Sequence, residues 1–442
     1  PANIQSSLID PRKLKPFKVI KNKLIKNIKF KNLDKKIKKI AKQIYLSKRP
    51  LLHLGQGVRI SKSIKDFKNF INQHKIPFTL TWNATDIIES NNPLFAGRPG
   101  AFAERGANFI VQNSDLFLSI GSRLPFMVTG YNSKDFARNA IRITVDIDKN
   151  EVNKKTLDFD CRLEVDAKYF IKKLNSYLKI TKPNKDWIKY CRDIRKKYPI
   201  VLDHYKSQKN FVNSYFFIDY LSDLLKNSET VVTDMGLSFV GTHQAFKTKK
   251  NQKVFTNSGH APMGWGLPAA IGASFAKNKK DVICLSGDGG LQMNIQELAT
   301  VMHHKLPIKI FIFNNGGYLT IKQTQELGFN NRIMGSNKET GLSFPNYKKI
   351  AEAYKIRYFK IDNHIQLKKS LHSILSYAGP VICELVMDNE QQQIPKAINK
   401  RDKRGKSQAT TFEDMYPFLN KKEIDESTFN HYIKMLNKGK KL

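Results

Sequence analysis

The chain is poor in acidic residues, in cysteine and in long apolar runs. Its 442 residues include 38 Asp and Glu against 76 Lys and Arg, which gives a formal charge of +38. The four cysteines show no CxxC spacing, so neither a disulfide framework nor a zinc site is expected. No apolar run reaches membrane-spanning length, because glycine and proline interrupt the uncharged stretch at 260–276.

The positive charge alone does not indicate a nucleic-acid ligand. Most of the basic residues are lysines, and they are spread over helical patterns such as 33–43 and over the tail at 437–442. A nucleic-acid-binding protein should cluster arginine and aromatic side chains on one element, and no such cluster is visible in the sequence. We therefore expect no nucleic-acid partner and no membrane partner, and a basic nucleic-acid-binding protein is only the third alternative.

The N-terminal sequence shows no secretory signal, so we expect a cytoplasmic protein. The sequence begins at Pro1 rather than at methionine, which leaves a targeting segment upstream of it open.

The composition and the pattern of elements predict an α/β protein. At 40% hydrophobic and 11% aromatic residues the chain is globular, and its length calls for more than one core. Strand and helix patterns alternate, which favours two Rossmann-like, doubly wound domains with parallel sheets. The expected divisions are a linker at 1–31, a central Rossmann-like domain at 32–175, a linker at 176–208, a second α/β domain at 209–390 and a polar C-terminal tail at 391–442.

Two strand-like runs in the second domain end in polar residues flanked by glycine. The run ICLS precedes Gly287-Asp288-Gly289-Gly290, and the run IKIFIF precedes Asn314-Asn315-Gly316-Gly317. The carboxyl ends of parallel strands form a common ligand crevice. The connection at 290–313 is long enough for one helix and one returning strand, so the two strand ends are expected to be neighbours.

This pair of strand ends predicts a site for a divalent cation and a diphosphate. Asp288 offers a carboxylate and Asn315 an amide oxygen, which together with a backbone carbonyl, water and phosphate oxygens suit Mg²⁺. Glycine amides and the start of a helix, expected near Asn294, favour an anion. Either motif alone is more often an ordinary turn; the two together, at this spacing, favour the site.

The combination of GDG, 24 residues and NN resembles the signature of thiamine diphosphate enzymes, and its surroundings resemble the acetolactate synthase branch of that family. Four further stretches are similar, at 259–272 (GHAPMGWGLPAAIG), 240–244 (VGTHQ), 121–132 (GSRLPFMVTGYN) and 145–154 (VDIDKNEVNK). The resemblance runs over nearly all of residues 1–390.

The resemblance implies roles for individual residues. It implies that Asp288 and Asn315 bind Mg²⁺ by their side chains and Gly317 by its carbonyl. The cofactor contacts that it implies are Gly241, His243, Gln244, Met263, Gly287, Gly289, Gly290, Asn315 and Gly317. Met263 is expected to wedge between the two rings of thiamine diphosphate and bend the cofactor, although a methionine among apolar neighbours is usually core filler. The alternative for His243 is a capped loop histidine, but its place in the motif favours the cofactor contact.

The resemblance also raises FAD, which acetolactate synthases hold in the central domain without using it as a redox group in the main reaction. The positions that match are Gly55, Gly57, Arg98, Gly121, Arg123 and Asp146. Because the GQG loop at 55–57 falls short of GxGxxG, tight turns in a purely structural domain are the alternative.

Two departures from the family matter. The family takes its catalytic glutamate from an N-terminal domain that has no counterpart here, so we expect the C-terminal two-thirds of a longer enzyme that turns nothing over alone. In addition, Thr324 stands where acetolactate synthases place a tryptophan that selects the second 2-keto acid.

The expected activity is that of an acetolactate synthase of branched-chain amino acid biosynthesis, which joins two pyruvates into acetolactate and releases CO₂. The expected partners are 2-keto acids and further copies of the chain in a homodimer or tetramer. Another 2-keto acid decarboxylase, a 2-hydroxyacyl-CoA lyase and a catalytically incomplete cofactor-binding fragment are the alternatives.

Overall fold

The computed structural model describes residues 7–8, 10–15, 30–180, 183–401, 407–408 and 410–439. Most of the linker predicted at 1–31 therefore lies outside the described residues. Within the described part of the chain, no helix combines the length and the apolar character needed to cross a membrane.

The first domain is built on a five-stranded parallel sheet with the strand order β2-β1-β3-β4-β5. Its strands are β1 (Pro50–Leu54), β2 (Phe78–Leu80), β3 (Leu116–Ile120), β4 (Ile141–Asp146) and β5 (Cys161–Glu164). Both faces of the sheet are buried, as is usual for parallel sheets. Leu52 and Leu54 face a core shared with α2 (Phe30–Leu46), α4 (Ile64–His74) and α8 (Ala167–Tyr177), whereas Leu51 faces α5 (Arg105–Asn113).

The second domain is built on a six-stranded parallel sheet with the order β10-β11-β9-β8-β6-β7. Its strands are β6 (Thr230–Thr233), β7 (Lys253–Phe255), β8 (Val282–Gly287), β9 (Ile308–Asn314), β10 (Arg357–Ile361) and β11 (Val381–Val386). One face packs on α11 (Ser214–Leu224), α12 (Leu237–Ala245) and α18 (His364–Ser376). The other face packs on α13 (Gly266–Ala276), α15 (Leu298–His303) and α17 (Tyr347–Ala353).

The two sheets confirm the predicted α/β class, and each contains one point at which the strand order reverses. In the first sheet the strand order reverses at β1, because β2 and β3, the next two strands along the chain, lie on opposite sides of it. In the second sheet the strand order reverses at β6, which lies between β7 and β8. Ligands of such sheets bind outside the carboxyl ends of the strands at these switch points. The carboxyl ends of β6 and β8 are therefore the favoured position for a site in the second domain.

The segment predicted as a linker at 176–208 is instead largely helical. Asn184 caps α9 (Lys185–Lys197) by accepting a hydrogen bond from the backbone of Trp187, and α10 (Asp203–Lys206) follows. Trp187, Tyr190 and Ile194 pack into the core of the first domain beside α5. The aromatic residues at helical spacing thus extend the first domain to about the end of α9.

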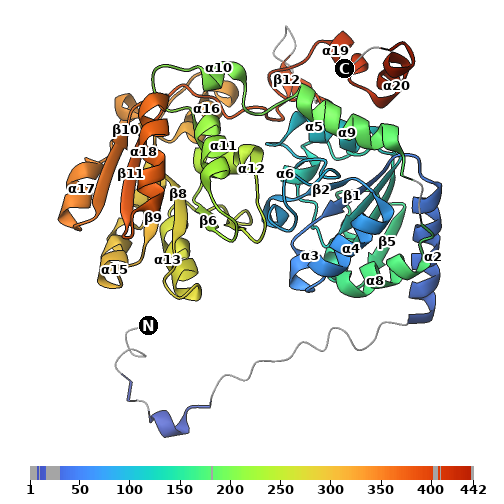
Figure 1. Ribbon diagram of the computed structural model, residues 1–442, viewed down its shortest axis with the longest axis horizontal. Coiled ribbons are helices and arrows are strands. Elements are labelled where there is room, and N and C mark those ends of the chain that lie inside the picture. The colour runs from blue at the N-terminus through green and yellow to red at the C-terminus, as the bar shows by residue number, and fades with distance from the viewer. Residues whose placement is uncertain are drawn as a thin grey trace.

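The predicted polar tail at 391–442 also has a packed structure. It contains the short hairpin β12 (Lys400–Arg401) and β13 (Ser407–Gln408), then α19 (Lys421–Glu426) and α20 (Phe429–Asn437). Phe412, Met415 and Tyr432 are buried, and α20 lies against α9 of the first domain (Figure 1). The end of the chain therefore returns from the second domain to cover the first.

The two domains lie side by side (Figure 1), and Arg98 joins them. Arg98 is only 2% exposed. Its guanidinium donates to Thr85 Oγ1 at 2.6 Å in the first domain and to the carbonyl oxygens of His243 and Phe246 at 3.2 and 2.8 Å in the second. Glu104 balances its charge at 3.6 Å. A buried arginine therefore ties the first domain to the end of α12.

Removing this arginine should loosen the interface between the domains. We expect Arg98→Ala to lower the free energy of unfolding by about 3 kcal/mol, because it leaves two buried carbonyls without a donor and removes a buried cation. Arg123→Ala is the matched control, since Arg123 is exposed and contacts only Glu151 at 3.5 Å among its ion pairs, and should change stability by less than about 0.5 kcal/mol. Urea unfolding measures the stability of both variants, and an equal loss of stability in the two would contradict the role of Arg98 at the domain interface.

Candidate functional site

The site forms where β8 and β9 end side by side. The two strands are parallel neighbours, and Gly287 lies opposite Phe313 in their register. The residues just beyond, Asp288 and Asn315, are 2% and 8% exposed. The helix expected near Asn294 starts earlier, because α14 (Asp288–Gln292) begins at the aspartate itself. The predicted juxtaposition of the two strand ends is thus present.

Backbone amides surround the Asp288 carboxylate. Oδ1 accepts from the Gly289 amide at 2.7 Å, and Oδ2 accepts from the amides of Asn315 and Gly317 at 3.1 and 3.2 Å. The Tyr347 hydroxyl donates to the Asp288 carbonyl at 3.0 Å. Burial nevertheless raises the pKa of Asp288 to about 7 from an ordinary value of 3.8, although these hydrogen bonds oppose the shift. A nearby positive charge would favour the ionised form.

The side chain of Asn315 lies against the same carboxylate. One terminal atom of its amide lies 3.0 Å from Asp288 Oδ2 and 3.0 Å from the Gly317 carbonyl oxygen. Without a cation the amide satisfies both oxygens by presenting its nitrogen. With a cation between them it would present its oxygen instead, so that carboxylate, amide and carbonyl oxygens face one point. Such hard oxygen ligands suit Mg²⁺.

This triad of Asp288, Asn315 and Gly317 has a single carboxylate. The described residues contain no group of three His, Cys, Asp or Glu side chains able to hold a metal ion. The triad does not form such a group, because only one of its three members is among these residue types. A site of this type needs further oxygens from a ligand, as a diphosphate would supply.

The glycines of the turn after β8 are required by close packing. A Cβ on Gly289 would overlap the Tyr318 ring and lie 3.1 Å from Met263 Cε, and a Cβ on Gly290 would overlap the Asp234 carboxylate. Met263, predicted from the resemblance, therefore does lie against the turn that carries Asp288. Gly287 ends β8 and precedes α14, as predicted.

The sequence reasoning missed Asp234 as a site residue. It follows β6 directly, is fully buried, and accepts a hydrogen bond from the Ser286 hydroxyl at 2.7 Å. Burial raises its pKa. The signal was present, because Asp234 ends an apolar strand, as Asp288 does, and is followed at one residue by Gly236, whose φ is +74°.

The VGTHQ stretch, expected to form a second loop near the diphosphate, is instead helical, and this corrects the prediction of a turn for Gly241, His243 and Gln244. All three are buried inside α12. His243 stacks on Trp82 at 5.3 Å, and Gln244 donates to the Pro395 carbonyl at 2.9 Å. Gly241 packs on Ile218 of α11, whereas His243 and Gln244 face the first domain, where Gln244 also donates to the Ala103 carbonyl at 3.3 Å.

In the first domain the predicted dinucleotide residues are largely occupied by other contacts. A Cβ on Gly55 would overlap the Gly121 carbonyl, and the Gly57 amide donates to that carbonyl at 2.9 Å. The three glycines are thus explained by one loop packing on another at the ends of β1 and β3.

The three other residues predicted for FAD differ from one another in their contacts. Arg98 is committed to the domain interface, which corrects its assignment. The exposed Arg123 pairs with Glu151. Asp146 ends β4, where it is partly buried and accepts from the Asp148 amide at 3.0 Å.

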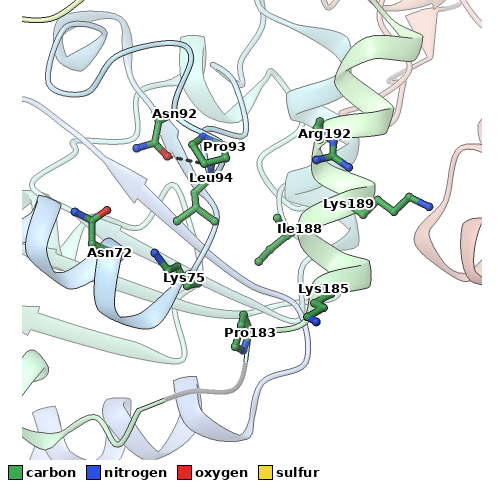
Figure 2. Close-up of a pocket in the computed structure, with 10 residues that line it drawn as sticks. All are labelled: Asn72, Lys75, Asn92, Pro93, Leu94, Pro183, Lys185, Ile188, Lys189 and Arg192. Atoms are coloured by element: carbon green, nitrogen blue, oxygen red, sulfur yellow. Dashed lines mark hydrogen bonds between the residues drawn. The ribbon is translucent and has the colours of Figure 1, made fainter.

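A cavity of about 530 Å³ lies away from the triad, between α4, the segment at 92–94 and α9 (Figure 2). Its lining residues are Asn72, Lys75, Asn92, Pro93, Leu94, Pro183, Lys185, Ile188, Lys189 and Arg192. None of them is a predicted site residue, and Lys189 extends away from the other lining residues in Figure 2. We assign no function to this cavity.

Two family models match the chain. Residues 37–174 match the thiamine pyrophosphate enzyme, central domain, and residues 234–385 match the thiamine pyrophosphate enzyme, C-terminal TPP binding domain. The first match covers the five-stranded sheet, and the second begins at Asp234 and covers most of the six-stranded sheet with the triad.

Individual relatives agree with these matches. The chain is 31% identical over 367 residues to the acetolactate synthase large subunit of Cyanidium caldarium, across 82% of this chain and 61% of the relative. It is 34% identical over 356 residues to that of Porphyra purpurea, across 79% and 59%. It is 30% identical over 349 residues to the acetolactate synthase isozyme 2 large subunit of Escherichia coli (strain K12), across 79% and 62%. The chain thus spans about three fifths of these relatives' length.

The buried carboxylate should leave a signature in stability against pH. The folded pKa of Asp288 is about 7 and its ordinary value is 3.8, so the folded chain binds the proton more tightly in this range. Its contribution to stability is therefore fully present below pH 3.8 and is lost as the pH rises to 7. Without metal, the free energy of unfolding should fall with pH more steeply than in Asp288→Ala, by up to about 1.4 kcal/mol per unit. Urea unfolding at pH 4–8 gives the free energy of unfolding of both proteins. The same dependence on pH in the wild type and in Asp288→Ala would refute the raised pKa of Asp288.

Proposed function

The chain belongs to the thiamine pyrophosphate enzymes, and on that basis we propose that it binds thiamine diphosphate together with Mg²⁺. We propose further that the whole protein decarboxylates 2-keto acids and joins the product to a second carbonyl, as in acetolactate synthase. The observation that carries the proposal is that one terminal atom of the Asn315 amide lies 3.0 Å from both Asp288 Oδ2 and the Gly317 carbonyl oxygen, at the carboxyl ends of β8 and β9.

The triad would hold Mg²⁺ and, through it, the diphosphate. The cation would neutralise the Asp288 carboxylate, which burial otherwise makes unfavourable. Asn315 would turn its amide oxygen to the ion, and the Gly317 carbonyl would complete the set from the protein. The diphosphate and water would supply the remaining oxygens of an octahedral shell.

The remaining residues of the site bind and orient. Thiamine diphosphate, when bound, supplies a carbon nucleophile and an electron sink for decarboxylation. Met263 gives an apolar support beside Gly289, against which the two rings of the cofactor would be held. The Tyr318 ring packs against Gly289 beside Met263, so the two side chains together would bound the turn.

The substrate pair follows less directly from the site. Thr324 stands on α16 (Leu319–Gly328) where the synthases carry tryptophan, and its hydroxyl donates to the Thr320 carbonyl at 2.8 Å. A small exposed side chain there leaves room for a second substrate other than a 2-keto acid. We propose pyruvate as the first substrate. Product analysis of the full natural protein distinguishes the activities: acetolactate indicates a synthase, whereas a free aldehyde indicates a decarboxylase or a 2-hydroxyacyl-CoA lyase.

We propose that the site faces another protein surface, as expected for a homodimer or tetramer. Met293 follows the turn after β8 and is 49% exposed, and Phe329 and Met334, just after α16, are 64% and 61% exposed. Apolar side chains gathered at a site commonly mark a surface that a partner covers.

FAD is not part of this proposal. The contacts of Arg98 join the domains, and Gly55, Gly57 and Gly121 pack on one another. Of the set, these contacts leave the exposed Arg123 and Asp146 in place, and Asp146 is the one with a carboxylate for a ribose.

Neighbouring asparagines provide a matched test of the triad. Asp288→Ala should abolish Mg²⁺-dependent binding of thiamine diphosphate, and Asn315→Ala should weaken it by about 10- to 100-fold, since each removes a ligand of the ion. Asn314→Ala is the control, because the Asn314 side chain donates to Glu384 at 2.6 Å and accepts from the Gly316 amide at 3.2 Å rather than facing the point of convergence, and the variant should bind within about threefold of the wild type. Titration calorimetry gives the three affinities, and unchanged binding by Asp288→Ala would refute the metal assignment.

The affinity for Mg²⁺ should depend on pH. The ion requires the ionised carboxylate, and a pKa of about 7 means that protons compete below that pH. We expect Mg²⁺ to bind about tenfold more weakly at pH 6 than at pH 8, with release of a proton at pH 6. Calorimetry in buffers of different ionisation enthalpy detects that proton, and equal affinities at the two pH values would contradict the role of Asp288.

A further inference from the structure

A second buried carboxylate lies beside the triad without belonging to it. Asp234 follows β6, next to β8 in the sheet, and has no solvent exposure. Its Oδ1 and Oδ2 accept from the Gly264 amide at 2.9 and 3.3 Å, and its Oδ2 also accepts from the Ser286 hydroxyl at 2.7 Å. The carboxylate therefore faces the residue that directly follows Met263.

Gly264 is held from both sides. Its amide donates to Asp234, and its carbonyl accepts from Asn294 Nδ2 at 2.8 Å. Its φ is +87°, and a Cβ there would lie 2.5 Å from Met293 Cβ, so no other residue fits without a shift. The backbone just after Met263 is thus fixed by one side chain from β6 and one from the segment after α14.

The same carboxylate also touches the turn that carries Asp288. A Cβ on Gly290 would overlap Asp234 Oδ2, and a Cβ on Gly266 would lie 2.8 Å from Asp234 Cβ. Gly266 opens α13, so Asp234 also lies where the N-terminus of a helix favours negative charge. Asp234 is therefore a shared point of contact between the Met263 turn and the Asp288 turn.

We propose that Asp234 is a positioning residue that fixes Met263 relative to the metal triad. The proposal rests on the proposed function, since Met263 matters in this way only if it supports the bound cofactor. Asp234 itself touches neither the triad's point of convergence nor a substrate; it sets the spacing between the part of the site that would hold the diphosphate and the part that would hold the rings. A displacement of about 1 Å at such a point can lower a rate about 10²-fold.

The first test needs no ligand. The chain has three tryptophans, of which Trp265 adjoins Gly264 while Trp82 and Trp187 lie in the first domain. With 5-fluorotryptophan incorporated, Asp234→Ala should shift or broaden the fluorine resonance of Trp265 alone, assigned by Trp265→Phe. Asp234→Asn should leave it near the wild-type position, because an amide can still accept from Gly264 and donate to Ser286.

Glu384→Gln is the matched control for this test. Glu384 is another buried carboxylate of the same sheet, on β11, and it accepts from Asn314 and Tyr358. Its substitution should leave the Trp265 resonance unchanged. An unmoved Trp265 resonance in Asp234→Ala, or an equal change at all three tryptophans, overturns the proposal.

The second test separates positioning from binding in the full natural protein. Asp234→Ala should lower kcat by about 10²-fold or more while the Mg²⁺-dependent Kd for thiamine diphosphate stays within about threefold, and Asp234→Asn should restore most of kcat. A parallel loss of cofactor affinity overturns the proposal. A wild-type protein that binds no thiamine diphosphate refutes the proposed function and with it the role of Met263, whereas a failed fluorine test refutes only the role of Asp234.

Discussion

A carboxylate enclosed by protein is unstable as an anion unless something restores the charge interactions that water provided. Asp288 is in this position at the end of β8, where three backbone amides reach it and its pKa still rises to about 7. A cation bound beside the carboxylate would offset the free energy that burying this anion costs. The Asn315 amide and the Gly317 carbonyl turn toward the same point, and the rest of the site is arranged around it.

The order of the strands in the second sheet explains the position of the site. Strand order reverses across β6, so the ends of β6 and β8 open a crevice between their connecting segments. Asp234 and Asp288 end these two neighbouring strands and lie on either side of the glycine turn. Asp288 belongs to the triad and Asp234 accepts from Gly264, so a short stretch of sheet edge positions both the triad and the Met263 turn. Arg98 and the buried face of α12 then tie this domain to its neighbour.

The strands and the meeting of Asp288 with Asn315 could be predicted from the sequence because their signals are local. Apolar runs ending in GDGG and NNGG fix both the strands and the register that joins Asp288 to Asn315. The α12 residues could not be placed, because VGTHQ has the composition of a turn but lies in an apolar helix whose burial depends on the other domain. Arg98 was misread for a similar reason: its partners are carbonyl oxygens about 150 residues away, which no local pattern reveals. Asp234 carried a signal that a search for paired motifs overlooked.

The proposed site requires one cation between the oxygens of the triad. Crystals of the protein grown with Mn²⁺ and thiamine diphosphate would show this directly by anomalous scattering. The account predicts one strong peak about 2.1–2.2 Å from Asp288 Oδ2, the Gly317 carbonyl and the Asn315 side-chain oxygen, with that amide turned to present its oxygen. A peak elsewhere, or an Asn315 amide that still donates its nitrogen to the Gly317 carbonyl beside bound cofactor, would contradict it.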